Sequence, residues 1–420
     1  MNESSDNHLI HPPRSTSKST SKSTSKYSPD YHSPSHPPSH PPSHLPGHVF
    51  YMEGTGFTVK KTALFSSQDV SYSCGYAEGK KLMIYHELSQ LERTLPIFQI
   101  DTKLSKVRMG NYEKHDNAPR MVYLSRYIEQ KVLPFVDKQL MPYLEGYYNV
   151  ELHDSYSYLD TDHKKYANCL VWSKKKNDDH PILMPDIYHL FNFGDRLINH
   201  KDISSWEGGK NDKNDKIGFW GSTTGNRNPE KNDRINKCIW FHRQDSKHEI
   251  SDCFITRIAQ MTYPEILAAR PQFPDIYTKP VTFEDQFRYK FLLDIPGNTC
   301  SWDRIPIVMN SNSLLFRFPC DDVCAFHSLF EENEHFVPVT EEDVFEKREY
   351  YLANPEKALA IITNAQAFSR EFFNGDAAQR YMVGLFTGAA ERRKEDEENK
   401  NKNKNKNKNP SHPLPPTQNL

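Results

Sequence analysis

The sequence predicts an α/β protein with parallel sheets, because short apolar runs typical of strands alternate with helical patterns and polar turns. The clearest case begins with the apolar run Tyr289–Asp294, which ends at Pro296-Gly297-Asn298 and is followed by a helical pattern from Ser301. A second apolar run covers Ser313–Phe318. Strand, glycine turn, helix and strand within about 30 residues form a βαβ unit.

Further strands and helices are expected on both sides of this unit. The strands cover Tyr148–Leu152, Cys169–Trp172, Ile217–Trp220 and His335–Val339. Thr340 precedes a run of acidic residues and suits a helix N-cap, and Asn354 with Pro355 predicts the start of another helix. Apolar residues would share one face of this last helix: Ala358, Ile361, Ile362, Ala365 and Phe368.

Low-complexity segments divide the chain into four parts. At 420 residues the chain exceeds one average domain. Residues 1–48, with Ser/Thr/Lys and His/Pro repeats, and residues 389–420, rich in Asn, Lys and Pro, are predicted to be disordered tails. A polar stretch from His200 to Lys216 separates the expected N-terminal domain, 49–199, from the expected C-terminal domain, 200–388.

Charge and cysteine content narrow the class of protein. The 53 basic and 55 acidic residues are nearly balanced, so the charge does not indicate nucleic-acid binding. We expect neither a transmembrane segment nor a signal peptide, because no long apolar run occurs. The odd set of 7 scattered cysteines predicts reduced thiols without a metal site and a cytoplasmic location. The Asn/Lys and His-Pro-Pro-Ser repeats suggest an AT-rich genome of a parasite or a large DNA virus. For a viral protein, the expected location would be the host cytoplasm or the virion.

A polar cluster containing His153 and Asp154 follows the expected strand at Tyr148–Leu152. Open α/β sheets bind ligands at the carboxyl ends of their strands. Asp154 is therefore placed to act as a general base. The alternative is that Asp154 caps a turn, as Asp before Ser commonly does.

Two glycine turns follow later strands. The first contains Ser222, Thr223 and Arg227, and Arg234 follows further on. Their hydroxyl groups and charge suit a phosphate, although an ordinary surface turn is equally compatible. It is not a P-loop, because the Gly-Lys-Ser/Thr motif is absent. In the turn of the βαβ unit, backbone N–H groups and a helix N-terminus would face phosphate oxygens. The candidate donor-binding residues of this second turn are Gly297, Asn298, Ser301 and Arg304.

Four residues are candidates for lining a cleft at these strand ends: His153, Lys174, Asp186 and Lys290. Lys174 follows an expected strand and Asp186 lies in a Met-Pro-Asp-Ile turn. For both of them a surface charge or a turn former is the simpler interpretation.

These clusters together resemble glycosyltransferase family 90, which includes lipopolysaccharide-modifying enzymes, capsule-associated xylosyltransferases and protein O-glucosyltransferases. The resemblance rests on the His153–Leu159 stretch, the Gly221–Gly225 turn and the block from Tyr289 to Leu314. They occur in the order typical of the family and lie within 110–380, with the closest likeness to the bacterial lipopolysaccharide-type branch.

The resemblance implies a GT-B fold, in which two Rossmann-like domains face each other across a cleft. It implies inverting, metal-independent transfer of a hexose or pentose from a nucleotide sugar, expected to be UDP-linked, to a hydroxyl of a glycan, lipid-linked glycan or protein. No cofactor is expected. Asp154 matches the family's proposed base, and the nucleotide contacts map onto Ser222, Arg227, Ser301 and Arg304.

Two departures leave an alternative open. Many relatives carry Arg before the Gly-Ser turn, where this chain has Trp220, and one extra residue lies between Gly297 and Arg304. The alternative function is a non-catalytic glycan- or nucleotide-binding protein that retains the fold. The retention of Asp154 and of the matched Ser and Arg residues favours the enzyme.

Overall fold

The computed structural model describes residues 67–86, 95–113, 115–154, 168–191, 199–200, 202–206 and 212–408. The tail predicted at 1–48 and the last part, 409–420, of the tail predicted at 389–420 lie outside these ranges. Among the helices of the described ranges, none is both long and apolar enough to cross a membrane.

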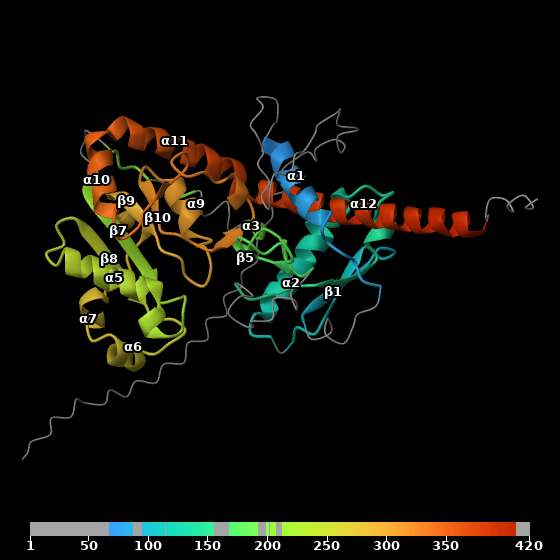
Figure 1. Ribbon diagram of the computed structural model, residues 1–420, viewed down its shortest axis with the longest axis horizontal. Helices are drawn as coiled ribbons and strands as arrows, with labels where there is room; N and C mark the ends of the chain where they lie inside the picture. Colours follow the sequence, from blue (N-terminus) through green and yellow to red (C-terminus); the bar gives the residue numbers. More distant parts are fainter. Residues whose placement is uncertain are drawn as a thin grey trace, which may run out of the picture. The chain divides into compact units, whose positions relative to one another are not determined.

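A parallel sheet forms the centre of the C-terminal part of the chain (Figure 1). Its strands, in the order β12-β10-β9-β7-β8, all pair in parallel. They are β7 (Asn214–Ser222), β8 (Ser251–Arg257), β9 (Tyr289–Asp294), β10 (Leu314–Arg317) and β12 (Val337–Pro338). The predicted α/β class is therefore confirmed for this part, and so is the βαβ unit, in which α9 (Arg304–Met309) joins β9 to β10.

The strand order reverses between β7 and β9. From β7 the chain adds β8 on one side, then returns to place β9 on the other side and continues outward to β10 and β12. Such a reversal is a topological switch point, and ligands bind outside the carboxyl ends of the strands that flank it. Because β7 ends at Ser222 and β9 ends at Asp294, both predicted glycine turns begin there.

Helices pack their apolar faces against this sheet, as the sequence predicts for α11 (Pro355–Phe372). Its buried residues include all members of the expected face, and Ala358 and Ile361 join the same core as Phe291 of β9. The other helices of this part are α5 (Asp233–Gln244), α6 (Tyr263–Ala269), α7 (Phe273–Ile276), α8 (Phe283–Gln286) and α10 (Val344–Ala353).

Two predicted helix starts are wrong by three residues. The helix expected after Thr340 is α10, which begins at Val344 with Asp343 as its N-cap, because the Asp343 carboxylate accepts the Thr340 N–H at 2.8 Å and holds a turn. In the βαβ unit, α9 begins at Arg304 rather than Ser301, since Asp303 occupies its N-cap.

The N-terminal part contains an antiparallel sheet, which differs from the parallel sheet expected there. It has the order β2-β1-β3, from β1 (Ile97–Asp101), β2 (Lys106–Gly110) and β3 (Gly146–Asn149). The short turn at 102–105 joins β1 to β2 as a hairpin, which imposes antiparallel pairing. A parallel pair of β4 (Leu170–Val171) and β6 (Ile182–Leu183) follows, and β5 (Ser173–Lys175) pairs with β11 (Asp322–Cys324).

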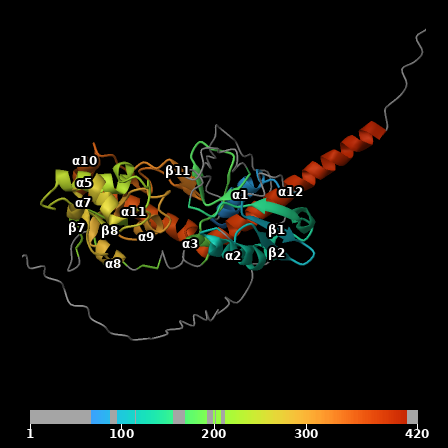
Figure 2. The same cartoon turned by 90° about the horizontal axis from the view of Figure 1, so that it is seen from below.

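The first and last described helices pack closely against each other (Figures 1 and 2). They are α1 (Ser67–Gly79) and α12 (Gly375–Lys408). A Cβ on Gly75 or Gly79 would lie 1.8 or 1.9 Å from a backbone carbonyl oxygen of α12, and Gly384 and Gly388 approach α1 in the same way. Only glycine allows backbones to meet at this distance.

The structure also differs from the disordered tail predicted from residue 389, because α12 continues to Lys408. Charged residues that suggest a solvated tail instead anchor the helix. Tyr76 of α1 donates a hydrogen bond to Glu391, Arg393 donates to the Tyr143 carbonyl at 3.2 Å, and Arg393 pairs with Glu397 one turn later.

Cys300 and Cys324 form a disulfide, so the expectation of reduced thiols is wrong for this pair. The other five cysteines are free. The two partners lie 24 residues apart, in the turn after β9 and at the end of β11, and their spacing offers no sequence signal for the pairing.

Candidate functional site

The two glycine turns at the switch point touch each other. A Cβ on Gly225, whose φ is +130°, would lie 3.4 Å from the Gly297 carbonyl oxygen. A Cβ on Gly297 would lie 2.9 Å from both an Arg234 nitrogen and the Thr224 hydroxyl. Glycine at both positions therefore permits the close approach of the turns, which the sequence predicts only as separate features.

Asn298 connects the two turns to Asp154. Its side-chain oxygen accepts the Gly225 N–H at 2.8 Å, and its side-chain nitrogen donates to the Asp154 carboxylate at 3.0 Å. The oxygen of this amide thus binds the first turn, while its nitrogen binds the candidate base. The sequence places Asn298 in the site without indicating this bridging role.

Arg120 of α2 (Ala118–Tyr127) holds the other carboxylate oxygen of Asp154 at 2.8 Å. The same guanidinium donates to the Leu152 carbonyl at 2.7 Å and lies 5.6 Å from the centre of the Trp302 ring. Ser173 donates to the Asp154 backbone carbonyl at 2.7 Å. Asp154 is therefore held in place on its backbone and on both side-chain oxygens, and each oxygen keeps a lone pair for a further hydrogen bond.

Arg234 of α5 joins the two turns from beneath. Its guanidinium donates to the Thr224 hydroxyl at 2.6 Å, the Ile295 carbonyl at 3.0 Å and the Ser301 hydroxyl at 3.3 Å. Burial lowers the pKa of Arg234, while Asp294 and Asp303 oppose that shift. A half-buried guanidinium with several hydrogen-bond partners fixes loop geometry and places positive charge behind the turns.

The first turn presents some predicted residues outward and one inward. The Ser222 and Thr224 hydroxyls lie 3.1 Å apart, and Arg227 is exposed on the same turn. Thr223 is buried, and its hydroxyl donates to the Ala259 carbonyl at 2.8 Å and accepts the Ala259 N–H at 2.8 Å. Thr223 therefore holds the turn against the segment after β8 rather than facing a ligand.

Arg304 occupies the protein interior. It donates to the side chain of Gln286 at 3.1 Å and to the Trp220 carbonyl, and its guanidinium lies 4.8 Å from the centre of the Phe219 ring. Burial lowers its pKa to about 10. Its contacts support the end of β7, which differs from the direct donor contact that the sequence predicts.

In the structure, three of the four candidate cleft residues make contacts that support the fold. Lys174 is buried and donates to the Pro181 carbonyl at 3.3 Å. Lys290 pairs with Asp215 at 2.7 Å, near the amino ends of β9 and β7 and thus at the opposite edge of the sheet. Asp186 caps α3 (Ile187–Leu190) by accepting backbone N–H groups.

His153, the fourth candidate, stays beside Asp154 and forms a cluster of its own. Its Nδ1 lies 2.7 Å from the Glu151 carboxylate, and its ring centre lies 4.3 Å from that of His115. Burial lowers the pKa of His115, with His153 adding to the shift.

Two residues that contact the site, Arg120 and Trp302, have no predicted role, and Arg234 is expected from the sequence only to supply charge. Arg120 and Trp302 meet beside Asp154, and Arg234 supports both turns. Arg120 lies 34 positions before Asp154, so no local spacing indicates their pairing.

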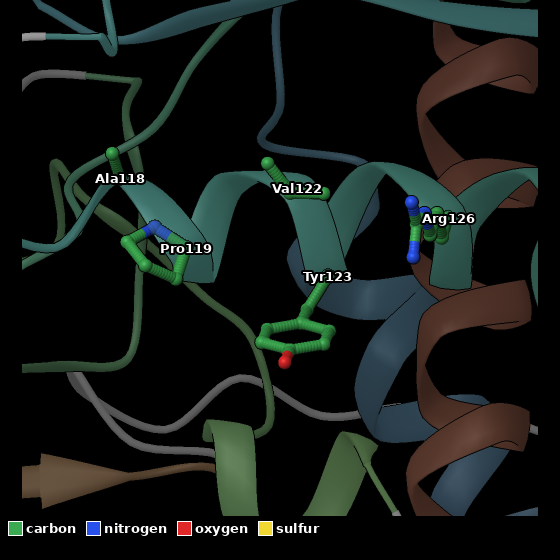
Figure 3. Close-up of a pocket in the computed structure, with 5 residues that line it drawn as sticks. All are labelled: Ala118, Pro119, Val122, Tyr123 and Arg126. Atoms are coloured by element: carbon green, nitrogen blue, oxygen red, sulfur yellow. The ribbon is translucent and has the colours of Figure 1, made fainter. Parts of the chain in front are cut away.

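A shallow groove of about 370 Å³ lies along another side of α2 (Figure 3). It is lined by Ala118, Pro119, Val122, Tyr123 and Arg126. The Tyr123 ring is exposed and lies 5.3 Å from the ring of Phe191. None of the predicted site residues lines this groove.

A parallel sheet with two glycine turns at its switch point is typical of nucleotide-binding α/β proteins. Residues 214–409 match the family model described as glycosyl transferase family 90. The predicted family is therefore confirmed over this part of the chain, which is a glycosyltransferase domain. The match begins at the first residue of β7 and includes both glycine turns and Arg234.

Two solved structures show weak similarity. TarM aligns with a TM-score of 0.30 and 12% identity over 43% of this chain and 36% of TarM, so the chain spans about a third of that protein. The C-terminal domain of the glycosyl transferase group 1 family protein LpcC from Francisella tularensis aligns with a TM-score of 0.27 and 10% identity, over 38% of this chain and 86% of that domain. A search of curated protein sequences finds no match.

Proposed function

We propose that the protein transfers a sugar, with inversion, from a UDP-sugar to a hydroxyl of a glycan, a lipid-linked glycan or a protein, without a metal ion in the transfer step. One observation carries the proposal: Asn298 links Asp154 to the first glycine turn, where the strand order of the sheet reverses. This link supports the proposal, because a carboxylate and a glycine turn with hydroxyl side chains lie side by side.

Asp154 would act as the general base. Its carboxylate accepts the proton of the acceptor hydroxyl while the acceptor oxygen bonds to the anomeric carbon of the sugar. The bond from that carbon to the diphosphate oxygen breaks on the opposite face, which inverts the configuration. Arg120 and Asn298 hold the carboxylate and thereby fix its direction.

The leaving diphosphate gains negative charge as that bond breaks. Arg227, exposed on the first turn, and the Ser222 and Thr224 hydroxyls would contact it, with the charge of half-buried Arg234 behind them. Preorganised donors of this kind stabilise developing charge without reorganising during the reaction. In this proposal the arginines take the place that a metal ion has in other transferases.

We further propose a GT-B-like arrangement, with residues 200–388 as a Rossmann-like donor side and residues 49–199, whose three-stranded sheet is antiparallel, on the acceptor side. Support comes from the strand order of the C-terminal sheet and from Asp154, which precedes that sheet in the chain. Because the likeness is to the lipopolysaccharide-type branch of the family, a lipopolysaccharide glycan is the suggested acceptor class.

The proposal is tested by incubating the protein with a panel of UDP-sugars and candidate acceptors in the presence of EDTA, and measuring UDP release. We expect release with at least one donor, increased by an acceptor hydroxyl. A rise in melting temperature with UDP but no release with any donor or acceptor would instead support the alternative, a non-catalytic nucleotide-binding protein.

A further inference from the structure

Three potential metal ligands converge where the turn after β9 meets the end of β11. The ligand atoms of Cys300, Cys324 and His327 all lie within 4.8 Å of one another. In a tetrahedral zinc site, with Zn–S of about 2.3 Å and Zn–N of about 2.0 Å, ligand atoms lie roughly 3.3–3.8 Å apart. The three side chains are therefore already close enough for one ion to bridge them after small movements.

His189 of α3 is the candidate for a fourth ligand. It lines the same small cavity as Cys324 and His327. The volume of this cavity, about 10 Å³, leaves room for a single small occupant.

The hydrogen bonding of His189 is typical of a metal ligand. Its Nδ1 lies 2.6 Å from the Asp186 carboxylate, while its Nε2 is buried and has no hydrogen-bond partner among the described residues. A carboxylate that holds one ring nitrogen orients the imidazole and leaves the lone pair of the other nitrogen for a metal. This explains a buried polar atom that would otherwise stay unsatisfied.

The backbone separation of the two cysteines also suits a bridging ion. Their Cα atoms lie 7.1 Å apart, whereas disulfide-bonded residues usually lie about 4.4–6.8 Å apart. Two thiolates on one ion need more room than two directly bonded sulfurs. Two thiolates and Zn²⁺ also sum to zero charge, which suits the buried environment of Cys300 and Cys324.

We propose that Cys300, Cys324, His327 and His189 bind one Zn²⁺ when the cysteines are reduced, and that Asp186 orients His189. Two sulfur and two nitrogen ligands in tetrahedral geometry select zinc among common cellular metals. A dithiol reductant supplies two electrons and two protons to the disulfide and becomes a disulfide itself. The two cysteine thiols then release their protons as Zn²⁺ binds. The site would tie α3 to the turn that carries Ser301 and Trp302.

The test uses the full-length protein, reduced with a phosphine, freed of metal with a chelator and titrated with Co²⁺ under exclusion of air. We expect a thiolate-to-cobalt charge-transfer band in the near ultraviolet and strong visible bands of tetrahedral Co²⁺, saturating at one ion per chain and displaced by Zn²⁺. The histidines at 36, 40, 44 and 48 can bind Co²⁺ but contain no thiolate, so they cannot produce the charge-transfer band.

Matched variants separate this site from adventitious binding. Cys324→Ser should remove most of the charge-transfer band, while Cys320→Ser, which changes a free cysteine four positions away, should leave it intact. Asp186→Asn should weaken Co²⁺ affinity about 10–100-fold. If Cys324→Ser does not fold by circular dichroism, His327→Gln tests the same site through reduced affinity. Absence of the band in the wild type, or equal bands in the Cys324 and Cys320 variants, would overturn the proposal.

Discussion

Replacing Arg234 by Lys tests whether this residue holds the two glycine turns together. The guanidinium makes its best hydrogen bonds with Thr224 at 2.6 Å and with the Ile295 carbonyl at 3.0 Å, and a longer one with Ser301. Lysine has a shorter side chain and a single ammonium group, so it can keep only one of these partners. With about 1.5–3 kcal/mol for each hydrogen bond to a charged group, Arg234→Lys should lower the free energy of unfolding by roughly 3 kcal/mol.

Arg227→Lys is the matched control, because Arg227 is exposed on the same turn. This change should alter the free energy of unfolding by no more than about 0.5 kcal/mol. Urea denaturation measures both effects, and the shift in melting temperature with UDP measures binding. We expect both variants to bind UDP more weakly but only Arg234→Lys to be less stable. Equal stability of the two variants would refute the structural role of Arg234.

Three further outcomes are expected. Gly297→Ala would place a Cβ 2.9 Å from Arg234, so overpacking should cost about 1–3 kcal/mol in urea denaturation and reduce the UDP-induced shift in melting temperature; an unchanged shift would argue against contact between the turns. Gly79→Ala would place a Cβ 1.9 Å from a backbone oxygen of α12 and should destabilise by about 3 kcal/mol or more, unlike Gly110→Ala, whose Cβ would meet a side chain at 3.3 Å; similar losses would contradict the close helix contact. The pKa of His115 is lowered below 6.5 by burial and by His153, so its neutral form contributes stability above pH 6.5 that is lost as the pH falls through the folded-state pKa. His115→Gln should therefore flatten the loss of stability on acidification, and a parallel loss in both proteins would contradict this assignment.

The local features of the sheet could be predicted from the sequence. The β9 strand, its glycine turn and the parallel β10 are each encoded within a short stretch, and the apolar face of α11 follows from helical spacing. Because Asp154 and Asn298 each follow a strand, the sequence also places both in the candidate site. Their mutual hydrogen bond, however, joins residues 144 positions apart and appears only in the folded chain.

The features that the sequence analysis missed depend on long-range contacts. The glycines of α1 and α12 are conspicuous only when the two helices are known to pack against each other. The same contact explains why the predicted disorder after residue 389 is wrong. Charged residues after Ala390 bind α1 and the segment before β3 instead of solvent alone. The sequence predicts that Arg304 faces the donor, whereas the structure buries it. This burial depends on Gln286 and the Trp220 carbonyl, which precede Arg304 by 18 and 84 positions, so no local pattern indicates it.

The most direct test of sugar transfer by this site is the rate of UDP release by Asp154→Asn, compared with the wild type at saturating donor and acceptor. The substitution keeps the shape of the side chain but removes the base, so we expect the rate to fall by about 10²–10⁴-fold. The shift in melting temperature with UDP should persist, because the phosphate-facing turn is unchanged. A variant that releases UDP as fast as the wild type would contradict the assignment of Asp154 as the base.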